Sequence, residues 1–162
     1  MHKGFFMRTS KYAFTMIELV FVIVVLGILA AVAIPKLSGF TDDANQARGM
    51  ATISSIRSGI INERQSNLIK GITAFPAFLD DTTTYNTIDL ELFDGNGTGT
   101  DDIQILQYPV YSKSESGGWM KTAANRYNFY MSKTTTVQFD YNTTTGRFDC
   151  DYSDSNCKLL TR

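Results

Sequence analysis

The stretch FTMIELVFVIVVLGILAAVAIP occupies residues 14–35. No charged residue occurs from Leu19 to Ile34, and Glu18 is the only charge between Phe14 and Ile34. A helix over these 21 residues rises about 31 Å at about 1.5 Å per residue, which matches the hydrocarbon core of a bilayer. The stretch therefore predicts a transmembrane helix.

Residues 1–13 form a basic leader, with Lys3, Arg8 and Lys11 and no acidic residue. Because positive charge before an apolar helix keeps that end in the cytoplasm, we expect a cytoplasmic N-terminus. The prediction is a single pass through the membrane, with the rest of the chain exported. Met7 is an alternative start, and the sequence leaves the choice between Met1 and Met7 open.

Glu18 separates this segment from two other kinds of apolar N-terminus. A cleaved secretory signal has a shorter apolar core followed by small residues, a pattern that Ala30, Ala31 and Ala33 could mimic. A plain anchor has no use for a carboxylate, which is costly in lipid unless it finds a partner. A cut before Phe14 would create an ammonium about one helical turn before Glu18. In a bundle, the carboxylate of one subunit could pair with the ammonium of its neighbour and set their stagger.

The segment from Phe14 to Leu19, the apolar run and Pro35 resemble the N-terminus of type IV pilins and type II secretion pseudopilins, over about residues 8–50. The resemblance implies removal of residues 1–13 by a prepilin peptidase that cuts between Ala13 and Phe14, followed by N-methylation of Phe14. It also implies that Glu18 directs assembly. The implied location is a bacterial inner membrane, with the C-terminal domain in the periplasm, or an extracellular filament. The family normally has glycine before the cut, and we expect cleavage to survive with Ala13 because alanine is the smallest substitute.

Beyond the span at residues 14–35, residues 36–71 are predicted to form an amphipathic half of the same helix. Pro35 lacks an N–H and is expected to kink or loosen the helix while the helix continues. Apolar residues then recur at spacings of three and four, which is typical of a helix that packs on a sheet. This stripe consists of Ala47, Met50, Ile53, Ile56, Ile60 and Ile61, with Leu68 and Ile69 further on. Lys70-Gly71 is the expected end.

Residues 72–162 are predicted to form a globular sheet region. After a loop-like stretch with a short element at 87–93, strand-like runs occur at 103–111, 126–131, 135–141 and 147–152. Asn142 to Gly146 is a hairpin turn, and Gly117-Gly118 marks another. The expected fold is α+β and pilin-like: one long helix packed on a small antiparallel sheet of three to four strands.

Composition disfavours an enzyme. The single histidine, His2, lies in the leader, so a chain without residues 1–13 has no imidazole to move protons or activate a nucleophile. Formal net charge is −1, and loss of the three basic leader residues leaves 12 basic against 16 acidic residues. Cys150 and Cys157 predict one small disulfide loop in an exported domain. Zinc is disfavoured, because neither a second cysteine pair nor a histidine is available.

The acidic, glycine-rich segment at residues 94–102 partly matches a calcium loop. Oxygen-bearing side chains recur along it at Asp94, Asn96, Thr98, Asp101 and Asp102. Gly99 is sixth, where a calcium loop turns sharply, but Ile105 is twelfth, where a glutamate is expected. A solvated turn is the preferred interpretation, calcium is the alternative, and no other cofactor is expected.

The expected function is that of a structural filament subunit. The resemblance implies as partners copies of itself and related pilins, the prepilin peptidase, the inner membrane, and secretion or pilus assembly machinery. The small globular region favours a type II secretion pseudopilus over a pilus for adhesion or DNA uptake. Nucleic-acid binding is an alternative because aromatic and basic residues mix at Tyr108, Tyr111, Lys113, Trp119, Lys121, Arg126, Tyr127, Phe129, Tyr130 and Lys133. A single-pass anchored binding protein that never polymerises is the alternative of another class.

Overall fold

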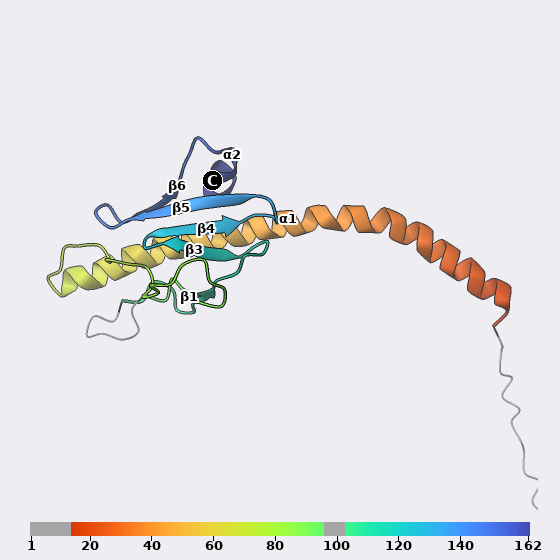
Figure 1. Cartoon of the computed structure of the whole chain (residues 1–162), viewed down its shortest axis with the longest axis horizontal. Coiled ribbons are helices and arrows are strands. Elements are labelled where there is room, and N and C mark those ends of the chain that lie inside the picture. Colours follow the sequence, from red (N-terminus) through yellow and green to blue (C-terminus); the bar gives the residue numbers. More distant parts are fainter. Residues whose placement is uncertain (1–13, 96–102) are drawn as a thin grey trace, which may run out of the picture. The chain divides into compact units, whose positions relative to one another are not determined.

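The computed structural model describes residues 14–95 and 103–162. The helix α1 (Met16–Ile69) comes first, and Figure 1 shows the elements that follow it. These are β1 (Glu91–Leu92), β2 (Val110–Tyr111), β3 (Trp119–Ala123), β4 (Arg126–Tyr130), β5 (Thr136–Asn142), β6 (Arg147–Cys150) and α2 (Ser155–Thr161). The chain forms two units, divided after Gly39, and the second unit contains the sheet. The α+β, pilin-like fold predicted from the sequence is confirmed.

The first unit contains the apolar part of α1. Thr15 caps its start, because the Thr15 hydroxyl accepts a hydrogen bond from the Glu18 N–H at 3.3 Å and the Thr15 carbonyl accepts from the Leu19 N–H at 3.2 Å. All side chains from Phe14 to Ile34 are exposed. By length and composition this helix can cross a membrane. It continues through Pro35, and the expected kink stays a prediction.

In the second unit, α1 packs on the sheet along a narrow stripe. Six buried positions follow one another at alternating spacings of four and three residues, and they are Gly49, Ile53, Ile56, Ile60, Glu63 and Asn67. Gly59, next to Ile60, is buried as well. The prediction was right for the three isoleucines and for Met50, which is partly buried against the core, and wrong for four other members of the expected stripe. Ala47, Ile61, Leu68 and Ile69 are exposed, because each lies one or two positions off this stripe.

Two glycines allow the close approach of α1 to its neighbours. A side chain at Gly49 would place its Cβ 2.6 Å from a ring carbon of Phe129, and one at Gly59 would overlap the backbone carbonyl of Ile105. The helix then ends as predicted at Lys70-Gly71. Gly71 has a φ of +83° and donates to the Leu68 carbonyl, while the Ile72 N–H donates to the Asn67 carbonyl. This pair of bonds is a Schellman cap.

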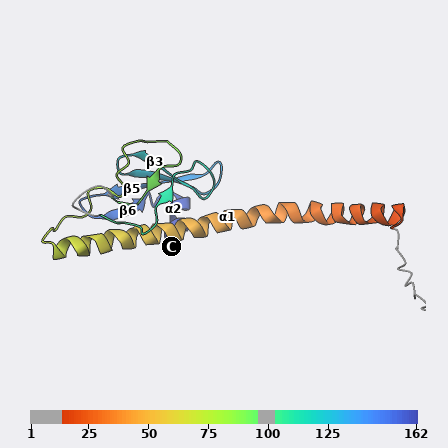
Figure 2. The ribbon, with the colours of Figure 1, turned by 90° about the horizontal axis from the view of Figure 1, so that it is seen from below.

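The main sheet is a four-stranded antiparallel meander in the order β3-β4-β5-β6. Figure 2 shows it beside the second part of α1. Alternate residues of β5 are buried, and their neighbours face solvent. The strands supply most of an aromatic core made of Phe93, Trp119, Tyr127, Phe129, Phe139 and Phe148.

The expected strand at residues 103–111 was wrong for most of its length. Only β2 forms there, and it pairs with β1, which lies within the short element expected at 87–93. The run expected at 147–152 ends at Cys150. Neither β3 nor the terminal helix α2 is predicted from the sequence. Asp154 caps α2 by accepting from the Asn156 N–H at 2.9 Å.

Candidate functional site

The candidate assembly site is the start of α1. Phe14 precedes the helix and is 78% exposed, and Glu18 stands in the first turn. Within residues 14–95 and 103–162, the structure gives the Glu18 carboxylate neither a hydrogen-bond donor nor an ion-pair partner. Ala13, the other side of the predicted cut, lies outside the described residues. The described chain therefore contains the exposed apolar segment and its carboxylate, but no group that neutralises this charge.

The two cysteines form the predicted bond. Cys150 at the end of β6 and Cys157 in α2 are joined, with their Cα atoms 5.8 Å apart. Cys157 and Leu160 are the buried residues of α2, and the Gln46 amide of α1 donates to the Leu159 carbonyl at 3.2 Å. The disulfide therefore holds α2 beside both the sheet and the long helix.

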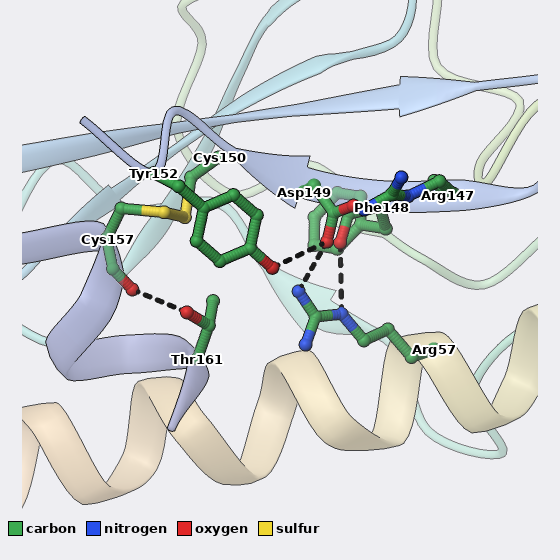
Figure 3. A network of polar contacts seen from close by, with 8 residues as sticks. All are labelled: Arg57, Arg147, Phe148, Asp149, Cys150, Tyr152, Cys157 and Thr161. Atoms are coloured by element: carbon green, nitrogen blue, oxygen red, sulfur yellow. Dashed lines mark hydrogen bonds and ion pairs between the residues drawn. A yellow bond between two sulfur atoms is a disulfide. The ribbon is translucent and has the colours of Figure 1, made fainter. Parts of the chain in front are cut away.

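A salt-bridge network joins α1 to the strand that carries the disulfide (Figure 3). Arg57 donates to Asp149 at 2.7 Å and, through Nε, to the Phe148 carbonyl at 3.0 Å. Arg147 donates to the other Asp149 oxygen at 2.8 Å, and Tyr152 donates to Asp149 at 3.3 Å. The local sequence does not predict this network, because Arg57 and Asp149 are 92 positions apart.

A second polar network lies inside the globular unit. Lys121 of β3 donates to Asp80 at 2.5 Å and to the Thr82 carbonyl at 2.6 Å. The side chains of Lys121 and Asp80 are only 3% and 0% exposed. Tyr127 donates to the other Asp80 oxygen at 2.6 Å. Burial, and then the adjacent Asp80 carboxylate, raise the pKa of Tyr127. This network fixes the loop after α1 to the sheet, and nothing in the local sequence indicated it.

The calcium prediction is only partly within the described residues. Asn96, Thr98, Asp101 and Asp102 lie outside them, whereas Asp94 is described. Burial, with the nearby Asp81, Asp80 and Glu91 carboxylates, raises the pKa of Asp94. In the described part of the chain, no three His, Cys, Asp or Glu side chains gather as metal ligands. Calcium binding therefore stays a prediction.

Comparison with known proteins gives a consistent result for the N-terminal segment. The prokaryotic N-terminal methylation motif matches residues 8–34. The type IV narrow pilus major component PilA5 of Thermus thermophilus is 53% identical over 45 residues, which cover 28% of this chain and 39% of that protein. A fimbrial protein of Dichelobacter nodosus is 34% identical over 71 residues, 44% of each chain.

Over its N-terminal segment, this chain is similar to proteins of the type IV pilin family. A fimbrial protein of Pseudomonas aeruginosa is also similar, with 28% identity over 99 residues that make up 61% of each chain. The chain thus spans between 39% and 61% of the length of these three pilus proteins. No solved structure is a significant match to the chain.

The globular region changes the interpretation of the aromatic residues considered for nucleic acid. Trp119, Tyr127 and Phe129 are buried in the core, so their ring faces cannot stack on bases. Tyr108 and Tyr111 are exposed, at 77% and 50%. Lys121 is buried with Asp80 and cannot contact a phosphate either. The structure therefore removes four of the residues on which that alternative depended.

Proposed function

We propose that this chain is a membrane-anchored structural subunit of a type IV pilus-like filament. The observation that carries the proposal is Glu18, a carboxylate without a partner in the described residues, at the start of an exposed apolar helix. A charge in lipid is costly unless it is paired, so the segment requires a partner from outside itself. Similarity to pilus components over this segment supports a neighbouring subunit as the source of that partner.

In this mechanism, cleavage before Phe14 removes the leader and exposes an ammonium group. That ammonium and Glu18 of a neighbouring subunit neutralise each other, while the apolar side chains from Phe14 to Ile34 pack between helices. Thr15 still caps the helix through its hydroxyl and carbonyl, so the Glu18 carboxylate is not needed for the cap. The proposal assigns the chain no catalytic role.

The test compares Glu18→Ala with Asp42→Ala, which removes an exposed carboxylate beyond the apolar segment. We expect both variants to insert in the inner membrane, and only Glu18→Ala to be lost from filaments. Incorporation is measured by cysteine or chemical cross-linking between subunits, and insertion by membrane fractionation. Normal incorporation of Glu18→Ala would remove the assembly role and leave a single-pass anchored protein.

Processing has an independent test in the mass of protein purified from its native cell. We expect the mass of a chain that begins at N-methyl-Phe14. The proposal places this chain in the inner membrane, with a cytoplasmic N-terminus and an exported C-terminal region. A mass that retains the leader would contradict cleavage between Ala13 and Phe14. A mass that begins after Ala31 or Ala33 would instead identify a secretory signal.

Two finer functions follow from different observations. The small globular region favours the pseudopilus of a type II secretion system, whereas the relatives named above are a type IV narrow pilus component and two fimbrial proteins. Shearing of intact cells distinguishes a surface pilus from a pseudopilus. A surface pilus would release the subunit into the supernatant, whereas a pseudopilus would retain it in the cell envelope. Deletion of the gene, scored for protein secretion and for DNA uptake, distinguishes the roles of the two filaments.

A further inference from the structure

The tip of the hairpin between β5 and β6 contains a sequence that the filament function does not use. Asn142-Thr143-Thr144 is an Asn-X-Thr triplet, which is the acceptor pattern for N-linked glycosylation on exported surface loops. The full sequence contains one other such triplet, Asn96-Gly97-Thr98, which lies outside the described residues. The hairpin triplet can therefore be judged by its geometry.

Asn142 and the two threonines that follow it are all exposed. Asn142 is the last residue of β5, in which alternate side chains are buried, and it belongs to the set that faces solvent together with Gln138 and Asp140. The loop is held on its other side, where Gly146 has a φ of +69° and packs against the ring of Phe75. A large group on Asn142 thus meets solvent and displaces no core side chain.

The local hydrogen bonds also suit the chemistry. The side-chain oxygen of Asn142 accepts from the Thr144 N–H at 2.9 Å and from the Thr145 N–H at 3.0 Å, which forms an Asx-turn. Two donors on this oxygen stabilise the imidate form of the amide, in which the nitrogen carries the reactive electron pair. Over the described part of the chain, no acceptor occupies the side-chain nitrogen of Asn142.

We propose that Asn142 is an N-glycosylation site, modified after the globular region has been exported. The co-reactant is an oligosaccharide linked to a lipid through pyrophosphate. The amide nitrogen of Asn142 bonds to the anomeric carbon of the sugar, and the bond from that carbon to the pyrophosphate oxygen breaks. The lipid pyrophosphate leaves with the electron pair, and a base of the transferase takes the amide proton. The proposal rests on the proposed function for one point, export of residues 72–162.

The experiment uses full-length protein purified from membranes or filaments of its native cell. Trypsin releases residues 134–147, a peptide that contains Asn142 and excludes the triplet at Asn96. We expect this peptide to carry the mass of a glycan, with fragment ions that place the sugar on Asn142. Thr144→Ala should abolish the glycopeptide, because it removes the acceptor pattern while its backbone N–H still supports the turn. Thr143→Ala, one residue away and equally exposed, should retain it.

An unmodified 134–147 peptide from the wild-type chain would overturn the proposal, and so would a sugar placed on Thr143 or Thr145. The N-terminal peptide of the same sample separates this result from a failure of the proposed function. N-methyl-Phe14 with an unmodified hairpin would contradict glycosylation alone. A retained leader together with a glycan on Asn142 would contradict processing alone.

Discussion

Removal of one partner from the buried Lys121–Asp80 pair should destabilise the globular region strongly. Lys121→Met retains much of the side-chain volume but leaves the Asp80 carboxylate buried, with donors only from Tyr127 and the Thr82 N–H. At an effective dielectric constant of about 20, two charges 2.5 Å apart attract by roughly 7 kcal/mol, which offsets the several kcal/mol that each charge loses on leaving water. The variant forfeits the attraction and keeps the desolvation cost of Asp80, for a loss of about 3–5 kcal/mol.

The double variant Asp80→Asn with Lys121→Met tests whether the unpaired Asp80 charge causes the loss of stability. It removes both charges, and the side-chain oxygen of the introduced asparagine can still accept from Tyr127. We therefore expect the double variant to be more stable than Lys121→Met alone, although it carries one more substitution. Arg126→Met is the matched control, because it breaks the Arg126–Asp140 pair at 2.7 Å on the exposed face of the same sheet. That pair is about half exposed, and its loss should cost only about 0–1 kcal/mol.

The assay is urea unfolding of the detergent-solubilised full chain, followed by tryptophan fluorescence. Trp119 is the single tryptophan of the sequence and is buried in the core, so the signal comes from the globular region alone. Equal losses for Lys121→Met and Arg126→Met would refute the argument from burial. A double variant less stable than Lys121→Met would refute the claim that the uncompensated carboxylate causes the loss.

Two further predictions use the same assay. Gly59→Ala should lower the free energy of unfolding by about 1–3 kcal/mol, because its methyl group overlaps the Ile105 carbonyl. Ser58→Ala, on the exposed side of α1, is the control and should be nearly neutral. Equal stability of the two variants would show that α1 can move away from Ile105 at no cost. Stability should also fall as pH rises from 10 to 12, because burial raises the pKa of Tyr141 to about 12 and raises the pKa of Tyr127 as well. Below the ordinary tyrosine pKa of about 10, each hydroxyl is protonated in both the folded and the unfolded chain, and its contribution to stability is complete. Above that pH the unfolded chain loses the proton first, which lowers the free energy of unfolding. A flat profile across this range would contradict it.

The fold could be predicted where local sequence decides it. The apolar run, the stripe at Ile53, Ile56 and Ile60, and the cap at Gly71 each follow from residues close together in the chain. The errors have long-range causes. Ile61 and Ile69 are apolar but lie beyond the width of helix that the sheet covers.

The missed strand β3 has a similar explanation. Trp119, Met120 and Lys121 are all buried, so the strand lacks the alternation that identifies a half-buried strand from sequence. Lys121 is tolerated there because Asp80, 41 positions earlier, neutralises it. Such a pair leaves no signal in either local segment, and the same is true of Arg57 and Asp149. The candidate assembly residue was found because a single carboxylate in an apolar run is conspicuous without any structure.

The pattern Thr15-Met16-Ile17-Glu18 also matches a capping box, which offers a purely local purpose for the glutamate. In a capping box the glutamate side chain bonds back to the N–H of the cap residue. Here the Thr15 hydroxyl accepts from the Glu18 N–H, yet no donor contacts the Glu18 carboxylate within the described residues. The cap therefore uses the backbone of Glu18 and leaves its charge available. Because a threonine alone is sufficient to start the helix, the cap does not account for the Glu18 carboxylate, and the assembly role proposed above is consistent with this geometry.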